Sequence, residues 1–162
     1  MTVAELTLDS RGRPAELLLV EDNYGDVLLT REACQNARMP NNLSVAGDGE
    51  EALSMLRREG RHANHPRPDL ILLDLNLPRM DGREVLDTIK SDPALLRIPV
   101  IVLTSSAAEI DVLKSYDLKA NSYVVKPVNF DRLQEIIASI ESFWLTVVAL
   151  PTTTAGEPSG GR

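Results

Sequence analysis

Short apolar runs alternate with longer amphipathic segments between residues 16 and 143, and this alternation predicts five strands and five helices. The strands are expected at residues 16–20, 43–46, 70–74, 100–103 and 123–125, and the helices at 26–37, 50–58, 83–90, 107–116 and 129–143. Strand–helix alternation repeated five times implies right-handed crossovers. The pattern therefore predicts an α/β fold with a doubly wound parallel sheet.

Three of the expected strands are apolar at every position: Leu17–Val20, Leu70–Leu73 and Val100–Leu103. Continuous apolar runs are typical of parallel strands that helices cover on both faces, because half-exposed strands alternate apolar and polar residues. Ser106 and Glu109 stand three positions apart and have the form of a capping box. This pair predicts that a helix starts just after the Val100–Leu103 strand.

The composition fits one globular domain, since 43% of the 162 residues are hydrophobic and 25% are charged. Turn-rich sequence without periodicity predicts flexible tails at residues 1–14 and 151–162. We expect the folded domain at residues 15–143, followed by an apolar extension at residues 144–150.

The charge balance excludes some classes of partner. The formal net charge is -7 and the pI is about 4.8, which argues against direct nucleic-acid binding, because such binding needs clustered Lys and Arg. The single cysteine, Cys34, excludes an internal disulfide framework and a CxxC site. No apolar run reaches the ~18 residues of a membrane span, and the first residues lack a secretion signal. We therefore expect a soluble, cytoplasmic protein without a membrane partner.

Polar side chains follow the expected strands at their carboxyl ends. Glu21 and Asp22 follow the first strand, Asp74 ends the third, Thr104 follows the fourth and Lys126 follows the fifth. Sites in parallel sheets form beyond these strand ends, so the groups are expected to converge. Carboxylates without His or Cys suit Mg²⁺, and Lys126 could hold an arriving oxyanion. A carboxylate beside a metal with open positions is equipped to attack phosphorus.

Four pieces of the sequence resemble the receiver domain of two-component response regulators. They are Leu18–Asn23, Asp74–Gly82, Val102–Ser105 and Tyr123–Pro127. Their intervals also match that family, since Gly82 falls eight positions after Asp74 and Lys126 falls 22 after Thr104. The resemblance covers residues 16–143 and implies a flavodoxin-like (βα)5 fold with strand order 2-1-3-4-5.

The resemblance implies that Asp74 is the phosphoacceptor, which takes a phosphoryl group from a histidine of a partner kinase. Glu21 and Asp22 would help to hold Mg²⁺, together with Asp74 and the main-chain carbonyl of Asn76. Glu21 departs from the commonest pattern, and its longer side chain suggests a water-mediated contact with the metal. The protein would be a phosphoacceptor rather than an enzyme, although it would take part in its own phosphotransfer and autodephosphorylation.

The same resemblance implies a switch. Thr104 would hydrogen-bond a phosphoryl oxygen, Lys126 would pair with it, and Tyr123 would turn inward when Thr104 moves. The peptide bond between Lys126 and Pro127 would be cis, which could aim the Lys126 ammonium at the site.

A finer resemblance concerns single-domain regulators that are paired with bacterial phytochromes. It rests on the Glu21–Asn23 opening, the Asp74–Leu86 run and the late segment that includes Phe143–Leu145. It implies a histidine kinase of the phytochrome type as partner and no DNA-binding output domain. The kinase would dock around the first helix, including Tyr24 and Asp26.

The apolar segment Phe143–Leu150 extends past the usual end of the last receiver helix. Apolar surface costs about 25 cal/mol per Å² when it is left in water, so this segment is expected to pack on something. We favour a homodimer through the fourth helix, fifth strand and fifth helix, extended by an arm at residues 144–150. Packing on the parent domain is the alternative.

Each of these residues also has a simpler interpretation. Asp74 could cap a turn, and Glu21 and Asp22 could cap the first helix, where negative charge is favoured. Thr104 could be an ordinary strand residue and Tyr123 an edge aromatic. The combination of these residues, rather than any one of them, favours a phosphoryl site.

Three further features are expected to be structural. The arginine-rich loop 57–67 holds His62 and His65 without other metal ligands nearby, so a solvated, partner-facing loop is favoured over a metal site. The turn at residues 47–49 lacks the Gly-Lys-Ser/Thr signature of a phosphate loop. Cys34 is expected to be a packed small residue rather than a reactive thiol.

Three other functions fit the sequence less well. An aspartate phosphatase of the haloacid dehalogenase fold places Asp-x-Asp after its first strand, whereas Asp74-x-Asn76 follows the third strand here. Flavin binding needs a hydroxyl-rich phosphate loop where Glu21 and Asp22 stand, and their charges would repel the phosphate. A scaffold that has lost phosphorylation is disfavoured by the complete site.

Overall fold

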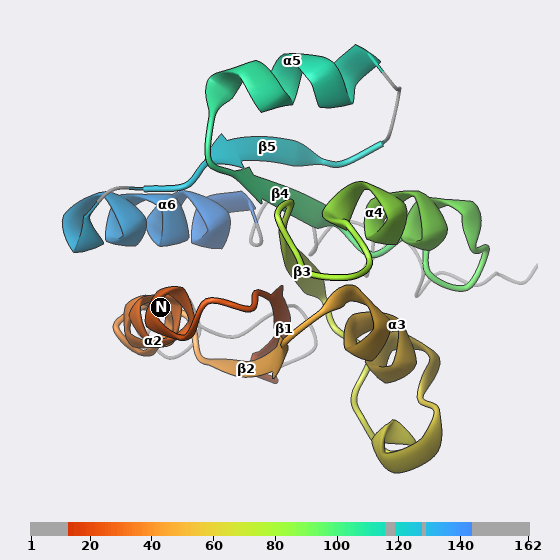
Figure 1. The fold of residues 1–162 in the computed structure, drawn as a ribbon. Coiled ribbons are helices and arrows are strands. Elements are labelled where there is room, and N and C mark those ends of the chain that lie inside the picture. The colour runs from red at the N-terminus through yellow and green to blue at the C-terminus, as the bar shows by residue number, and fades with distance from the viewer. Residues whose placement is uncertain (1–12, 116–118, 128, 144–162) are drawn as a thin grey trace, which may run out of the picture.

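Five parallel strands form one sheet in the order β2-β1-β3-β4-β5. The computed structural model describes residues 13–115, 119–127 and 129–143 (Figure 1). The strands are β1 (Ala15–Val20), β2 (Asn41–Ala46), β3 (Leu70–Asp74), β4 (Val100–Thr104) and β5 (Ser122–Val125). The expected α/β class and strand order are confirmed. The expected arm at residues 144–150, the tail at 151–162 and most of the tail at 1–14 lie outside the described residues.

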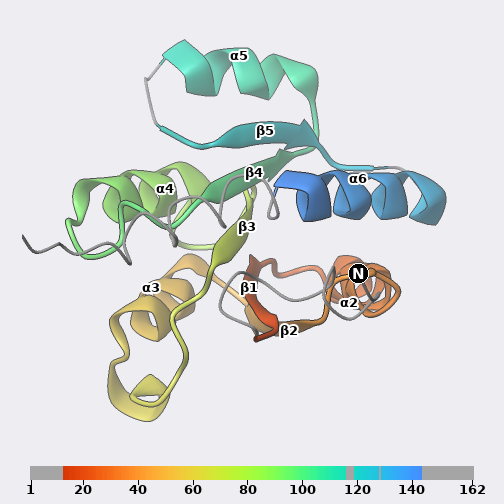
Figure 2. The same ribbon diagram turned by 180° about the vertical axis from the view of Figure 1, so that it is seen from behind.

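The helices lie on both faces of the sheet (Figures 1 and 2). Helices α2 (Tyr24–Gln35) and α6 (Phe130–Phe143) cover one face, whereas α3 (Gly49–Arg57) and α4 (Gly82–Ser91) cover the other. Helix α5 (Ala107–Ser115) lies beside β5, and a short 3-10 helix, η1 (Gly60–His62), follows α3. No helix within the described ranges is long and apolar enough to cross a membrane.

The three strands that contain the continuous apolar runs, β1, β3 and β4, occupy the centre of the sheet. Successive residues of β1 face opposite sides, so Leu18 packs in the core under α3 and α4 while Leu19 packs under α2 and α6. Every residue of β3 and β4 is buried. Full burial of one such side chain contributes roughly 1.5–3 kcal/mol, so these strands hold the two helical layers together.

The edge strands are less regular than the central ones, which explains why their sequence signal is weaker. Strand β2 is half-buried along most of its length, and no residue of β5 is fully buried. The outer position leaves one long side of each strand without a neighbour, so polar residues such as Asn41 and Asn42 are tolerated in β2. The strand therefore begins two residues before the apolar run that predicted it.

Local capping sets the helix starts. The side chain of Asn23 accepts a hydrogen bond from the amide of Asp26, and α2 consequently begins at Tyr24, two residues before its predicted start. Asp81 and Glu84 form a complete capping box at the start of α4. The pair Ser106 and Glu109 forms half of its predicted box, since the Glu109 amide donates to Ser106 Oγ at 3.3 Å.

Candidate functional site

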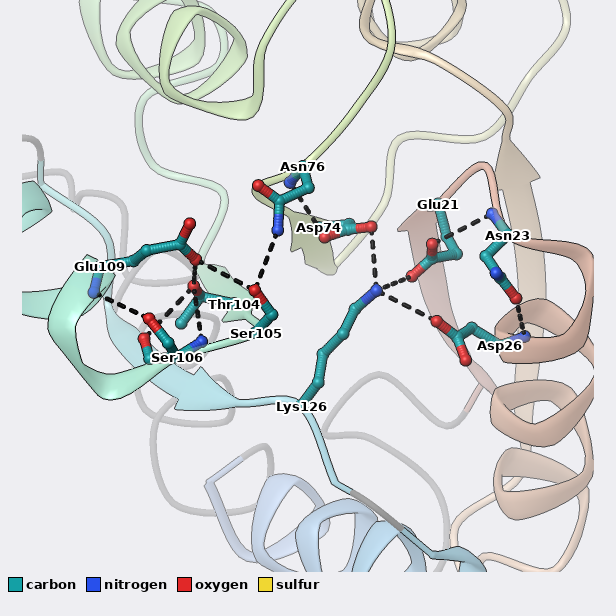
Figure 3. A network of polar contacts seen from close by, with 10 residues as sticks. All are labelled: Glu21, Asn23, Asp26, Asp74, Asn76, Thr104, Ser105, Ser106, Glu109 and Lys126. Atoms are coloured by element: carbon teal, nitrogen blue, oxygen red, sulfur yellow. Dashed lines mark hydrogen bonds and ion pairs between the residues drawn. The ribbon is translucent and has the colours of Figure 1, made fainter.

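The carboxyl ends of four strands bring the predicted site residues to one edge of the sheet. Glu21 follows β1 directly, Asp74 and Thr104 end β3 and β4, and Lys126 follows β5. The parallel register aligns these ends, because Asp74 pairs with Leu103 and Thr104 pairs with Val125. Figure 3 shows the side chains gathered at this edge.

Lys126 lies at the centre of three carboxylates. Its Nζ is 3.0 Å from Asp74 Oδ2, 3.1 Å from Glu21 Oε1 and 3.1 Å from Asp26 Oδ2 (Figure 3). Burial alone would lower the pKa of Lys126, but the hydrogen bonds to the three carboxylates outweigh it and raise the pKa above its ordinary value. Lys126 is thus a permanent cation that offsets part of the local negative charge.

Glu21 is an almost fully buried acid. Its Oε2 accepts a hydrogen bond from the Asn23 amide at 3.1 Å. Burial, together with the hydrogen bond and charge of Asp74, raises the pKa of Glu21 from 4.5 to about 7, although the Asn23 amide and Lys126 act in the opposite direction. The Lys126 ammonium therefore does not neutralise all the negative charge of these carboxylates, and a further cation would stabilise their charged forms.

Three carboxylates are placed to hold a metal ion together. One oxygen each of Glu21, Asp22 and Asp74 lies within 4.8 Å of the others, and Asp22 is exposed to solvent. This cluster could bind a divalent metal. The donors are oxygen atoms only, which suits a hard cation such as Mg²⁺ or Mn²⁺. Asn76 stands beside the cluster, since its amide donates to Asp74 Oδ1 at 3.1 Å.

Gly82, the first residue of α4, packs directly against the main chain at the end of β3. Its amide donates to the carbonyl oxygen of Leu75 at 3.1 Å. A Cβ at position 82 would lie 2.7 Å from the carbonyl oxygen of Asp74 and 2.7 Å from Leu75 Cα. Only glycine allows the helix start to approach the end of β3 this closely.

Thr104 is fully buried and belongs to a second group of polar contacts. Its hydroxyl donates to the carboxylate of Glu109, on the first turn of α5 (Figure 3). Asn76 lies between the two groups, because its amide contacts Asp74 and its side chain donates to Ser105 Oγ at 3.4 Å. The expected contact of Thr104 with a phosphoryl group thus requires its hydroxyl to leave Glu109.

Tyr123 is half-buried and packs against the core under α3, α4 and α5. It pairs directly with Val102 on β4, which lies two residues before Thr104. Its predicted role as a switch therefore remains a prediction about movement.

The expected cis peptide between Lys126 and Pro127 is wrong for this structure, because no peptide bond of the described residues is cis. The Lys126 side chain is long enough to reach Asp74 from a trans peptide, at the distance given above. The position of Lys126 directly after β5 is therefore enough to bring its ammonium to Asp74.

Two contacts of the site were not anticipated from the sequence. The sequence predicts a docking role for Asp26, whereas its carboxylate binds Lys126 in the structure. It predicts a capping role for Glu109, whereas the carboxylate of Glu109 accepts a hydrogen bond from the Thr104 hydroxyl. The capping residue Asn23 indicates that Asp26 lies in the first turn of α2, but it does not indicate the contact with Lys126.

The histidine-containing loop and Cys34, two of the features expected to be structural, are not part of the carboxylate cluster. Among the residues that the structure describes, the cluster containing Asp74 is the one group of three or more potential ligands close enough to hold a metal, and it does not include His62 or His65. Cys34 is buried in the core between α2 and the sheet, as expected.

Comparisons with known proteins agree with this geometry. The response regulator receiver domain model matches residues 17–138. Response regulator Rcp1 of Synechocystis sp. is 47% identical over 143 residues, which are 88% of this chain and 97% of that protein.

Solved structures of related proteins share the fold. A crystal structure of the phosphorylated cyanobacterial phytochrome response regulator RcpA has a TM-score of 0.75 and 52% identity, covering 82% of this chain and 95% of that one. The Mn²⁺-bound form of Rcp1 has a TM-score of 0.74 and 47% identity, covering 83% and 96%. The bacteriophytochrome response regulator AtBRR has a TM-score of 0.70 and 43% identity, covering 82% and 94%.

Proposed function

The chain belongs to the response regulator receiver family, a family of signalling proteins, and we propose that its phosphoacceptor is Asp74. The observation that carries this proposal is the position of the Asp74 carboxylate, which touches Lys126, lies within 4.8 Å of the other two acids and stands at the end of a buried strand. Family membership implies phosphorylation on an aspartate. Glu21 also combines a metal-binding position with a contact to Lys126. Asp74 is preferred because it begins the Asp74–Gly82 piece that resembles the phosphoacceptor motif of the family.

The chemistry follows from these contacts. An oxygen of Asp74 attacks the phosphorus of a phosphohistidine, the bond between phosphorus and nitrogen breaks, and its electron pair stays on the imidazole. Lys126 and the hydroxyl of Thr104 then hydrogen-bond the phosphoryl oxygens of the acyl phosphate. A divalent ion held by Glu21, Asp22, Asp74 and the carbonyl of Asn76 would supply charge neutralisation for the transferred group.

We assign Mg²⁺ as the ion that serves in the cell. Oxygen donors with open positions for water and phosphoryl oxygens suit it. The Mn²⁺-bound relative Rcp1 supports a divalent ion at this kind of site. Hydrolysis of the acyl phosphate by a water at the same site would end the signal, so autodephosphorylation is part of the proposal.

The proposed partner is a histidine kinase of the phytochrome type. Support comes from RcpA and AtBRR, which are named as phytochrome and bacteriophytochrome response regulators. The docking surface would include Tyr24 on α2, whose side chain is 75% exposed.

The proposed switch passes from Thr104 and Tyr123 to the face formed by α5, β5 and α6. Val112 and Val125 on this face are large apolar side chains that remain exposed, which supports its use in a homodimer. Sedimentation of the full chain and of a chain ending at residue 143 tests the contribution of residues 144–150. We expect a dimer that weakens on truncation, and monomeric behaviour of both chains would contradict the dimer.

Phosphorylation by a small donor tests the central assignment. Acetyl phosphate with Mg²⁺ should add one phosphoryl group to the intact protein, measured by mass spectrometry, and EDTA should prevent it. Asp74→Asn should abolish the addition, whereas Asp87→Asn, on the exposed face of α4, should leave it unchanged. Labelling that persists in Asp74→Asn, or labelling of the unchanged protein that hydroxylamine does not remove, would contradict the assignment.

A further inference from the structure

Asp26 gives the site a negative charge that the proposed phosphotransfer does not require. The Lys126 ammonium contacts three carboxylates, as many as it has N–H donors, and Asp26 is one of them. Its side chain is 43% exposed, whereas those of Glu21 and Asp74 are 2% exposed. Asp26 is thus the solvent-facing partner of Lys126.

A phosphoryl group that binds Lys126 has to replace one of these partners. Asp74 is the proposed nucleophile, and Glu21 is buried, so its release would leave a buried acid without its cation. Asp26 can return to water at little cost because it is already partly solvated. Release from Lys126 does not remove the charge, since Asp26 is fixed in the first turn of α2 by the bond from its amide to Asn23.

The surroundings of Asp26 leave space for an approaching group. A cavity of about 140 Å³ between α2 and α6 has Glu21, Asp26 and Lys126 among its polar lining residues. Leu29, Leu103 and Leu133 contribute to its apolar part. A cavity of this size admits several water molecules, so the Asp26 carboxylate can leave Lys126 and stay hydrated.

We propose that Asp26 is a specificity-determining residue that selects phosphoryl donors by the charge of their leaving group. The inference rests on the proposed function of Asp74. Donors whose leaving group is neutral or carries an N–H toward Asp26 are favoured, and donors that release an anion are disfavoured.

The two classes of donor differ in the charge of the group that leaves. In N-phosphoimidazole protonated on its second ring nitrogen, the Asp74 oxygen–phosphorus bond forms, the phosphorus–nitrogen bond breaks, and neutral imidazole leaves with its N–H able to donate to Asp26. In acetyl phosphate the phosphorus–oxygen bond breaks and its electron pair leaves on acetate. Like charges about 4 Å apart that are well solvated by water repel by about 1 kcal/mol, which changes a rate by roughly fivefold.

Rates with the two donors test this inference. Initial rates of phosphorylation of the full chain are measured by intact mass with N-phosphoimidazole and with acetyl phosphate, at equal ionic strength and saturating Mg²⁺. The ratio of the two rates is the readout, because a purely structural effect changes both rates together. We expect Asp26→Asn to lower the imidazole-to-acetyl ratio three- to tenfold, and Asp26→Glu to restore it.

Glu32→Gln is the matched control, since Glu32 is an exposed acid on the same helix with its side chain outside the site. It should keep the ratio of the unchanged protein, and added salt should reduce the effect of Asp26→Asn. An unchanged ratio in Asp26→Asn would overturn the inference while leaving the function of Asp74 intact. Absence of phosphorylation by both donors in the unchanged protein would instead overturn the proposed function, and the inference with it.

Discussion

Nη2 of Arg79 lies 2.6 Å from Oδ2 of Asp48, and this ion pair connects the loop after β3 to the start of α3. Asp48 also caps α3, because its side chain accepts a hydrogen bond from the Glu51 amide at 2.8 Å. Arg79 has a φ of 60°, in the left-handed region that disfavours residues with a Cβ. The pair therefore helps to hold the loop that follows Asp74, in which Arg79 has this uncommon backbone conformation.

Replacement of Asp48 by Ala should destabilise the protein by about 1 kcal/mol, because the helix loses its cap and Arg79 loses its partner. The Glu51 amide and then Arg79 lower the pKa of Asp48 below 3.8. A lowered folded pKa stabilises the fold above the unfolded value, and this contribution disappears as the pH falls through the folded value. Urea unfolding at neutral and acidic pH measures both effects.

Asp48→Asn provides the control, since asparagine caps helices nearly as well but has no charge. It should lose less stability than Asp48→Ala at neutral pH. Equal stability of the unchanged protein and Asp48→Ala at neutral pH would show that the cap and ion pair are not holding this region.

Gly82→Ala should damage both the fold and the site. The new Cβ would collide with the main chain of Asp74 and Leu75, so α4 has to move away from the end of β3, at a cost of about 1–3 kcal/mol. Phosphorylation by acetyl phosphate should slow because Asp74 moves with its backbone. Gly47→Ala is a suitable control, since its Cβ would meet only Glu51 Oε1 at 3.8 Å, and normal phosphorylation of Gly82→Ala would contradict the prediction.

The metal-free protein should lose stability as the pH rises from 4.5 to about 7. The folded pKa of Glu21 is raised to about 7 by burial and by Asp74, so the folded state binds a proton that the unfolded state has released. Chemical unfolding in EDTA should show the decline, and Glu21→Gln should flatten it. Mg²⁺ should bind more tightly as the pH rises through the same range, because Glu21 loses its proton. Mg²⁺ binding that does not change with pH would contradict the raised pKa of Glu21.

Glu109→Gln should slow the decay of the phosphorylated protein. The Thr104 hydroxyl has one proton, and it is donated to the Glu109 carboxylate in this structure. A neutral amide holds that hydroxyl less strongly than a carboxylate, so Thr104 can more readily donate to the phosphoryl group. The decay rate of the phosphorylated protein measures this, and a faster decay in Glu109→Gln would contradict the competition.

The positions of the site residues could be predicted because they depend on strand ends. Asp74 closes a buried apolar run, and a parallel sheet aligns that run with the ends of β1 and β4. Both limits of β3 agree with the prediction. The alignment needs only hydrophobic periodicity and right-handed crossovers, which a single sequence contains.

The partners of these residues could not be predicted in the same way. Lys126 and Asp26 are 100 positions apart, and their contact depends on the rotamers of two long-range neighbours. Glu109 fits the sequence pattern of a capping box, and its amide does donate to Ser106. Its carboxylate, however, accepts a hydrogen bond from the Thr104 hydroxyl. Sequence patterns indicate which groups reach an edge, whereas side-chain competition decides what each group binds there.

The most direct measurement of the central claim is the identity of the phosphorylated residue. The full chain is phosphorylated with acetyl phosphate and Mg²⁺, reduced with borohydride to convert the acyl phosphate into a stable alcohol, and sequenced by tandem mass spectrometry. The reduced residue should be at position 74 and should be absent in EDTA. Reduction at Glu21, Asp22 or Asp26 instead, or at no residue of the chain, would contradict the assignment of Asp74.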